Sequence, residues 1–319
     1  MPSDTYDFSR HWFLTGPTAS GKSAVGLRLA EAIDAEIIAL DSMSLYRGMD
    51  IGTAKPTKAQ QETIPHHLVD VLDPTEESSI ARYLQMAQKA ATEIEARGKR
   101  VLFVGGTPLY LKALLRGMSE GPPPDTQLRS EMEAEAERGG SEPLHARLKL
   151  VDPLSANQIH PHDTRRIIRA LEVYRTTGAP ISHQQLDFED SLAPEDCRAF
   201  WLSWPRPELH VRINARVDQM LEAGLLAEVE RLTQTYGKLS TTALQAVGYA
   251  EIIAHQQGEM ALPLAVERIK ARTRQFAKRQ CTWFRSLGEC RQVPLETEGD
   301  LADAHRQILN MADSATPPK

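Results

Sequence analysis

Residues 16–23 read "GPTASGKS" and match the pattern G-x-x-x-x-G-K-[ST] of a phosphate-binding loop. "HWFLT" before the loop is typical of a buried strand, and "SAVGLRLAEAI" after it of a helix, whose N-terminus favours anions. Within the loop, Gly16 and Gly21 permit a tight turn of converging N–H groups, Lys22 adds positive charge, and Ser23 offers a hydroxyl ligand for Mg²⁺. We predict a phosphate site formed by Gly16, Pro17, Thr18, Ala19, Ser20, Gly21, Lys22 and Ser23. The loop alone names no reaction, because kinases, hydrolases and transferases all use it.

The rest of the first third of the chain alternates strand and helix patterns. Short apolar runs at 35–41 and 100–106 are typical of buried strands, and residues 79–98 and 108–117 have the spacing of helices. Such alternation indicates parallel strands joined by crossover helices. Ligands of such sheets lie at the carboxyl ends of the strands. The residues expected there are the phosphate loop, Asp41-Ser42 and Gly105-Gly106-Thr107.

The alternation of strand and helix patterns stops at "GMSEGPPPD", residues 117–125, which is rich in glycine and proline. Charged helical segments follow to about residue 195, the clearest being a helix over 163–178 with Asp163 as N-cap and Gly178 as its stop. We interpret 118–195 as a helical insertion domain in a core formed by 1–117 and 196–319. The predicted fold class is α/β, a P-loop NTPase-like parallel sheet flanked by helices, with this insertion.

Two later helices carry clusters of positive charge. The amphipathic helix over 207–224 places Arg212 and Arg216 one turn apart, where they either clamp an anion or are ordinary solvated charges. The helix over 263–288 is strongly basic around an apolar stripe, which makes it a candidate surface for a phosphate backbone. The stripe is predicted to comprise Val266, Ile269, Phe276, Trp283 and Leu287, with both aromatic side chains mainly in the core.

Composition sets broad limits on function. The 319 residues are 41% hydrophobic, and Lys+Arg total 37 against 43 for Asp+Glu, so contact with a nucleic acid requires locally concentrated charge. The three cysteines have no zinc-ligand spacing. We find neither a signal peptide nor an apolar run long enough to cross a bilayer, so we expect a cytoplasmic protein with no membrane partner.

Asp41 is the nearest carboxylate that ends a strand, because "VLFVGG" ends in glycine instead of the Asp that usually holds Mg²⁺ opposite a phosphate loop. It could accept a proton beside the phosphate, or it could cap a turn with Ser42. The polar, glycine-rich stretch 41–56 that follows is where catalytic groups are commonly placed.

Several blocks of the chain together resemble the tRNA dimethylallyltransferase family, also called tRNA isopentenyltransferases, in its bacterial form. They run in order from residue 16 to residue 285. The blocks are "GPTASGKS", "IALDSMSLYRGMDIGTAKP", "PHHLVDVLDP", "GGTPLYLKALL", "HPHDTRRIIRALEVYRTTG", "HVRINARVDQMLEAGLLAEV", "ALQAVGYAEI" and "RQFAKRQCTWFR".

The resemblance implies transfer of a dimethylallyl group from dimethylallyl diphosphate to the exocyclic amine of the adenosine 3′ of the tRNA anticodon, with release of diphosphate. It implies catalytic roles for Asp41 as general base and for Arg216, Thr18 and Lys22 at the diphosphate, with Mg²⁺ on Ser23. The partner would be the tRNA anticodon arm, bound by a monomer, and the loop could also bind ATP. The implied tRNA contacts are Asp41, Ser42, Met43, Ser44, Thr107, Arg129, Arg165, Arg166, Ile167, Ile168, Arg169, Gln245, Gly248, Lys278, Arg279 and Arg285.

Three other functions share parts of this pattern. An isopentenyltransferase acting on free adenine nucleotides would need no RNA surface, and a small-metabolite kinase would share the phosphate loop and the fold. An RNA-binding module with a degenerate nucleotide site fits least, because the loop with its Lys22 and Ser23 is intact.

Overall fold

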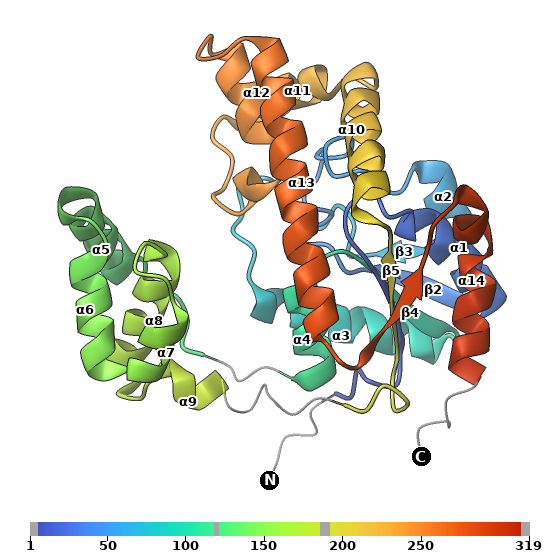
Figure 1. Ribbon diagram of the computed structural model, residues 1–319, viewed down its shortest axis with the longest axis horizontal. Helices are drawn as coiled ribbons and strands as arrows, with labels where there is room; N and C mark the ends of the chain where they lie inside the picture. The colour runs from blue at the N-terminus through green and yellow to red at the C-terminus, as the bar shows by residue number, and fades with distance from the viewer. Residues whose placement is uncertain (1–5, 118–120, 186–191, 314–319) are drawn as a thin grey trace. The chain divides into compact units, whose positions relative to one another are not determined.

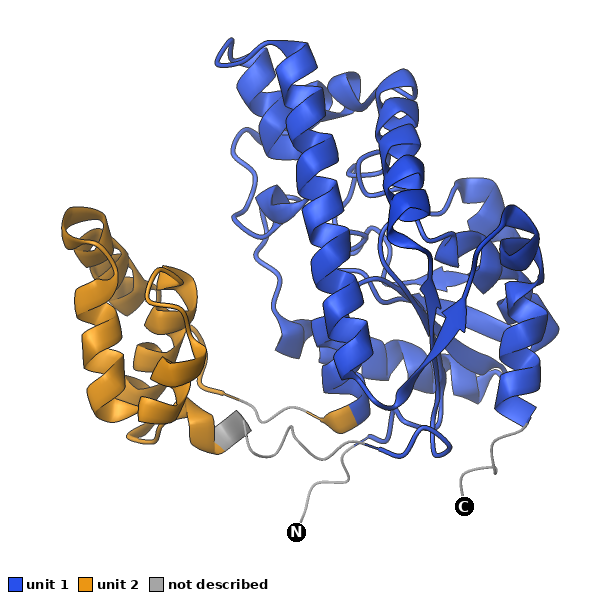
Figure 2. Cartoon of the chain, viewed as in Figure 1, with its two compact units in different colours: residues 1–115, 192–319 blue, residues 116–191 orange. Residues whose placement is uncertain are grey.

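The computed structural model describes residues 6–117, 121–185 and 192–313. The chain divides into two compact units, one formed by Met1–Leu115 with Leu192–Lys319 and the other by Arg116–Ser191 (Figure 2). Among the described residues, no helix is both long and apolar enough to cross a membrane.

The first unit is built on a six-stranded sheet in the order β3-β2-β4-β1-β5-β6, and all its strand pairs are parallel. The phosphate loop follows the central strand β1. This arrangement confirms the predicted α/β fold class. The strands are β1 (Trp12–Thr15), β2 (Ala35–Ala39), β3 (His66–His67), β4 (Arg100–Gly105), β5 (Arg198–Ser203) and β6 (Cys290–Pro294).

Helices cover both faces of the sheet, which explains why the strands β1, β2, β4 and β5 are largely apolar. Phe13 and Phe103 pack into one core cluster with α3 (Ile80–Ala96) and α4 (Pro108–Arg116). The neighbouring strand residues Leu14 and Leu102 pack into the other, with α1 (Lys22–Ala32) and α14 (Glu298–Asp313) (Figure 1). The alternation of strand side chains thus divides the core into two layers.

A group of helices from the last third of the chain completes the first unit. The long helix α13 packs against α10 and α12, and α12 packs against α11 (Figure 1). A short helix, α2, follows the stretch 41–56. The bounds are α2 (Lys58–Thr63), α10 (Arg206–Glu222), α11 (Leu225–Tyr236), the 3₁₀ turn η2 (Ala243–Gln245), α12 (Tyr249–Gln256) and α13 (Leu262–Ser286).

The buried face of α13 differs from the predicted stripe. Phe276 and Trp283 were expected in the core, but their side chains are 37% and 36% exposed. The face that packs consists of Ala265, Ile269, Ala277, Gln280 and Phe284. Ile269 and Leu287 of the expected stripe are buried as predicted, but the helix turns Ala277 and Phe284 toward the core instead of their neighbours Phe276 and Trp283. Ala265 and Ala277 allow the helix to approach its neighbours closely, and Phe284 is buried with them, whereas Phe276 and Trp283 are partly exposed.

The second unit is entirely helical over its described residues. Its core includes Leu144, Leu148 and Ile167, all fully buried. Asp163 caps the N-terminus of α8 by accepting a hydrogen bond from Arg166 N at 3.2 Å, and Gly178 ends the helix with φ of +73°, as predicted. The helices are α5 (Thr126–Gly139), α6 (Glu142–Val151), α7 (Pro153–Gln158), α8 (Thr164–Thr177) and α9 (Ile181–Gln185).

Candidate active site

The phosphate loop joins β1 to α1 and is supported by Trp204, which precedes α10, and by Arg212 of α10. Gly21 is the N-cap of α1 with φ of +88°, and Ala19 has φ of +62°. Trp204 donates its indole N–H to Ser20 O at 3.0 Å, and Arg212 donates Nε–H to Ala19 O at 2.9 Å. Arg212 also stacks over Trp204 and pairs with Glu298. Arg212 is therefore neither an anion clamp nor an ordinary solvated charge, because it supports the backbone of the loop.

Two cations of the loop region face one cavity. Lys22 donates to Pro17 O at 3.3 Å, and its pKa is lowered to about 8, chiefly by burial and further by the charge of Arg216. Burial also lowers the pKa of Arg216, whose Nε is buried without a hydrogen-bond partner among the described residues. The charge of Asp41 opposes both shifts. Two desolvated cations side by side form a site prepared for an anion.

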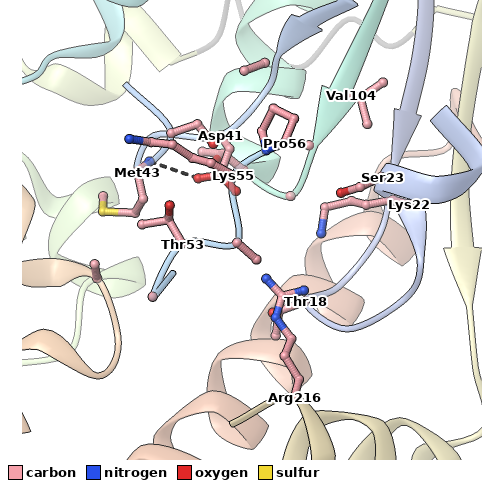
Figure 3. Close-up of a pocket in the computed structure, with 18 of the residues that line it drawn as sticks. Thr18, Lys22, Ser23, Asp41, Met43, Thr53, Lys55, Pro56, Val104 and Arg216 are labelled. Atoms are coloured by element: carbon pink, nitrogen blue, oxygen red, sulfur yellow. Dashed lines mark hydrogen bonds between the residues drawn. The ribbon is translucent and has the colours of Figure 1, made fainter. Parts of the chain in front are cut away.

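Asp41 lies across this cavity from Thr18, Lys22 and Arg216 (Figure 3). Its Oδ1 accepts a hydrogen bond from Met43 N at 2.9 Å, drawn as the dashed line in Figure 3. The carboxylate therefore does cap a turn, with Met43 instead of Ser42. Ser42 N donates to Thr107 Oγ1 at 3.2 Å, so the ends of β2 and β4 are joined. Only one oxygen of Asp41 is used by the turn, so capping leaves the other for chemistry.

The stretch 41–56 is held in place from α11 and α12. Buried Glu228 accepts hydrogen bonds from the N–H groups of Asp50, Ile51 and Gly52 at 3.0, 2.7 and 3.2 Å, and from Tyr249 Oη at 2.7 Å. A Cβ at Gly52 would lie 2.5 Å from the Tyr249 ring, so only glycine fits there. These bonds therefore hold the stretch 41–56, which begins with Asp41, in one conformation beside the cavity.

The cavity between these groups has a volume of about 460 Å³. Its polar and charged lining includes Thr18, Lys22, Ser23, Asp41 and Arg216. Its apolar lining includes a wall from α10, α11 and α13 and from the segment before α12. This apolar wall is formed by Ile213, Val217, Met220, Leu225, Val247, Ile269 and Phe276. A pocket with an anion site at one end and an apolar wall beside it suits a small apolar group carried on phosphate.

Comparison with known proteins identifies the family. The family model described as "IPP transferase" matches residues 44–287. A protein of Trichlorobacter lovleyi named tRNA dimethylallyltransferase 1 is 50% identical over 86% of this chain and 90% of its own length. The chain belongs to the tRNA dimethylallyltransferase (IPP transferase) family.

Solved structures of tRNA dimethylallyltransferases share the fold. A tRNA isopentenylpyrophosphate transferase of Bacillus halodurans is 35% identical, with a TM-score of 0.68 over 96% of this chain and 98% of that chain. A eukaryotic dimethylallyltransferase, described as acting on tRNA, is 27% identical, with a TM-score of 0.79 over 97% of this chain and 81% of that chain. The chain thus spans most of the length of both proteins.

The structure brings one part of the predicted tRNA-binding set to the cavity and places other parts elsewhere. Ser42, Met43, Ser44 and Thr107 line the cavity with Asp41. Another group is solvent-exposed on the first unit, where Arg279 stacks on Phe276 at 5.9 Å. Its members are Gln245, Lys278, Arg279 and Arg285. Gly248 is buried as the N-cap of α12, with φ of +110°.

The predicted contacts on the second unit divide into exposed and structural residues. Arg165 and Arg166 are exposed on α8, whereas Ile167 and Ile168 are buried in the core of the unit. The side chains of these two isoleucines therefore cannot reach a partner in this structure.

Arg129 and Arg169 are bound to fully buried Glu172. Arg129 makes two bonds of 2.8 Å to its carboxylate, and Arg169 makes one of 2.6 Å. Burial raises the pKa of Glu172, but the two guanidinium groups and Asp125 N lower it by more, so the net shift is downward. Arg129 and Arg169 therefore stabilise the second unit. The prediction of both residues as tRNA contacts did not include this role.

We expect Glu172→Gln to lower the free energy of unfolding of the chain by about 2 kcal/mol, because the amide cannot satisfy both guanidinium groups. The pKa of Glu172 is depressed in the folded state, so its contribution is present above the unfolded pKa of 4.5 and is lost as pH falls from there through the lower folded pKa. Urea unfolding at pH 7 and at a series of pH values below 4.5 checks both statements. Exposed Glu131→Gln on α5 is the control, and equal stability of both variants at pH 7 would contradict the role of Glu172.

Two residues that support the site were not singled out in the sequence. Gln280 bonds to the phosphate loop from α13, and Glu228 holds the stretch 41–56 from α11. Each is a polar residue on the buried stripe of its helix. Gln280 lies among Ala277 and Phe284 of α13, and Glu228 among Leu225 and Val229 of α11. A polar residue in a buried stripe is the signal that could have found them.

Proposed function

We propose that the protein transfers the dimethylallyl group of dimethylallyl diphosphate to the exocyclic amine of the adenosine 3′ of the tRNA anticodon. In this reaction a bond forms between the amine nitrogen and C1 of the allyl group, the bond from C1 to the diphosphate oxygen breaks, and diphosphate leaves with the electron pair. The amine loses one proton. The observation that carries the proposal is the single cavity with Asp41 on one side and Lys22 with Arg216 on the other.

The diphosphate would be held at the charged end. Lys22, Arg216 and the amide groups at the start of α1 would stabilise the negative charge that develops on the leaving group. A bound polyanion would also favour the protonated form of Lys22.

Asp41 would accept the proton of the attacking amine. The apolar wall beside the cavity would take the prenyl chain and keep water from the allylic centre. Because a stacked base cannot reach C1, the adenosine would be flipped out of the anticodon loop into the cavity.

Ser23 is suited to hold Mg²⁺ together with the diphosphate. It lies in the first turn of α1, lines the cavity and is exposed. No group of three or more His, Cys, Asp or Glu side chains able to hold a metal occurs in the described parts of the chain. One hydroxyl with substrate oxygens and water is a coordination that Mg²⁺ accepts. The ion would neutralise charge on the diphosphate.

The test is to incubate unmodified tRNA with the protein, Mg²⁺ and dimethylallyl diphosphate and to analyse the nucleosides by mass spectrometry. We expect the mass of one added dimethylallyl group on a single adenosine. Parallel reactions with free AMP, and with ATP in place of the prenyl donor, test the alternatives. Preferential prenylation of AMP would indicate a nucleotide isopentenyltransferase, and ATP-dependent phosphorylation without prenyl transfer would indicate a kinase.

The exposed basic face of α13 would contact the phosphate backbone of the anticodon arm, with Arg165 and Arg166 as further contacts. We expect R279Q/R285Q to raise the Kd for tRNA and to flatten the slope of log K against log salt by about 0.7–0.9 for each phosphate group that the variant no longer binds. The Kd for dimethylallyl diphosphate should not change. Filter binding over a salt series measures both tRNA quantities, and calorimetry measures the affinity for the prenyl donor.

The control for the α13 variant removes two positive charges from exposed residues of α3 and α14, as K89Q/R306Q. It should leave the salt slope unchanged. If both double variants bind tRNA like the unaltered protein, the tRNA surface lies elsewhere.

A further inference from the structure

Gln280 connects α13 to two backbone segments of the site. Its side chain is 3% exposed, and both ends of the amide are used. Oε1 accepts a hydrogen bond from Thr18 N at 2.9 Å, and Nε2 donates to Gly106 O at 2.6 Å. Thr18 belongs to the phosphate loop and Gly106 follows β4. Gln280 thus joins the loop to the neighbouring strand end with one side chain.

The space around Gln280 is filled. A Cβ at Gly106 would lie 2.8 Å from Gln280 Nε2, 3.2 Å from Gly16 O and 3.3 Å from Lys22 Nζ. Gln280, the first residue of the loop and the loop lysine therefore meet at one point beside Gly106. A movement of the Gln280 amide would lengthen its bonds to Thr18 N and Gly106 O, next to Gly16 O and Lys22 Nζ.

The bond from Thr18 N determines how the loop is presented to the cavity. Because this N–H is bound to Gln280, the Thr18 backbone is fixed while its side chain lines the cavity. The next residue, Ala19, has φ of +62°, and Lys22 reaches back to Pro17 O. The turn that arranges Lys22 is therefore anchored at Thr18 by a residue outside the loop.

We propose that Gln280 is a positioning residue for the diphosphate: it holds Thr18 and the loop in the arrangement that places Lys22 at the charged end of the cavity. This inference rests on the proposed function for the identity of the anion. A residue needed only to fill the core would be served by an apolar side chain, since burying an amide is costly unless both ends are bonded. Here both ends are bonded to backbone groups of the site.

Two substitutions separate positioning from packing. Q280M keeps the length of the side chain and removes both hydrogen bonds. Q280E keeps an acceptor for Thr18 N but loses the donor to Gly106 O, and it places a carboxylate near Lys22 that competes with the diphosphate. Q275M, at an exposed position of the same helix, is the matched control.

The first readout is the Kd for dimethylallyl diphosphate with Mg²⁺, measured by calorimetry, beside the Kd for tRNA. We expect Q280M to raise the donor Kd about tenfold and Q280E to raise it more, while tRNA affinity stays within about twofold. The second readout is hydrogen exchange of the peptide over 16–20, which we expect to speed up in Q280M while the peptide of β1 is unchanged. Q275M should match the unaltered protein in both.

An unchanged or lower donor Kd in a folded Q280M, with unchanged exchange at 16–20, would overturn the proposal and leave Gln280 as a core residue. If Q280M does not fold, Q280E decides by the same two measurements. Transfer to tRNA by the unaltered protein is assayed in parallel. Its absence would refute the proposed function, whereas normal transfer with an unaffected Q280E would refute only the role of Gln280.

Discussion

Replacing Asp41 with Asn is expected to slow prenyl transfer in a single turnover by about 10²–10⁴-fold. Asn has the same size and can still accept the hydrogen bond of Met43 N, so the turn and the fold should persist. It cannot take the proton of the attacking amine. Rapid-quench measurements with labelled dimethylallyl diphosphate and saturating tRNA, over a range of pH, determine the rate, and filter binding determines whether tRNA affinity is retained.

The control is Asp7→Asn, because Asp7 makes the same kind of turn by accepting from Ser9 N at 2.9 Å on the surface. It should leave the transfer rate unchanged. A near-normal rate for Asp41→Asn at every pH would show that Asp41 acts only as a turn cap.

Replacing Arg216 with Gln is expected to lower the transfer rate by about 10²–10³-fold, the effect of removing one donor that stabilises transition-state charge in a site protected from water. The Arg216 side chain is half-buried and lines the cavity, and its Nε is buried without a hydrogen-bond partner among the described residues. The guanidinium can therefore bind the leaving group. Donor affinity should fall as well, with little change in the Kd for tRNA. Calorimetry, filter binding and single-turnover rates separate these effects.

Arg206→Gln, at an exposed position at the start of the same helix α10, is the control for Arg216→Gln. It should behave like the unaltered protein. Loss of tRNA binding with intact donor affinity in Arg216→Gln would instead assign Arg216 to the RNA surface.

The core of the fold was predictable because its signals are local. A few neighbouring residues are enough to predict each of three features: the buried strand around Phe13, the turn at the glycines of the phosphate loop, and the capped helix α8. The ends of the strands then placed Asp41 and Thr107 at one edge of the sheet, and the structure joins them through Ser42 N. Parallel topology alone is enough for that inference.

Other parts of the fold have weak local signals. β3 has only two residues, His66 and His67, and exists as a strand because it pairs with β2. Similarly, β6 is half polar in "CRQVP" and becomes a strand beside β5. Tertiary pairing therefore supplies what the local pattern does not show.

The predicted face of α13 was wrong at Phe276 and Trp283 for a different reason. Phe276 and Trp283 dominate any apolar pattern, yet the face that packs needs small side chains such as Ala277 and a glutamine bonded to the loop. Which of two adjacent residues of a helix faces the core, about 100° apart, depends on the shape of the neighbouring helices and sheet. The second unit shows the same limit, because the bonds of Arg129 and Arg169 to Glu172 follow from packing and not from spacing.

The hydrogen bond between Thr18 and Gln280 joins residues 262 positions apart in the chain. During synthesis on the ribosome, the phosphate loop therefore emerges well before its partner on α13. Strands β1 to β5 are complete at Ser203, but the stretch 41–56 must then wait for Glu228 and Tyr249. Contacts of such long range carry a large loop-closure entropy and form late. A nascent or truncated chain that ends before α13 would therefore lack Gln280 and its bonds to Thr18 and Gly106, and so would lack a finished site.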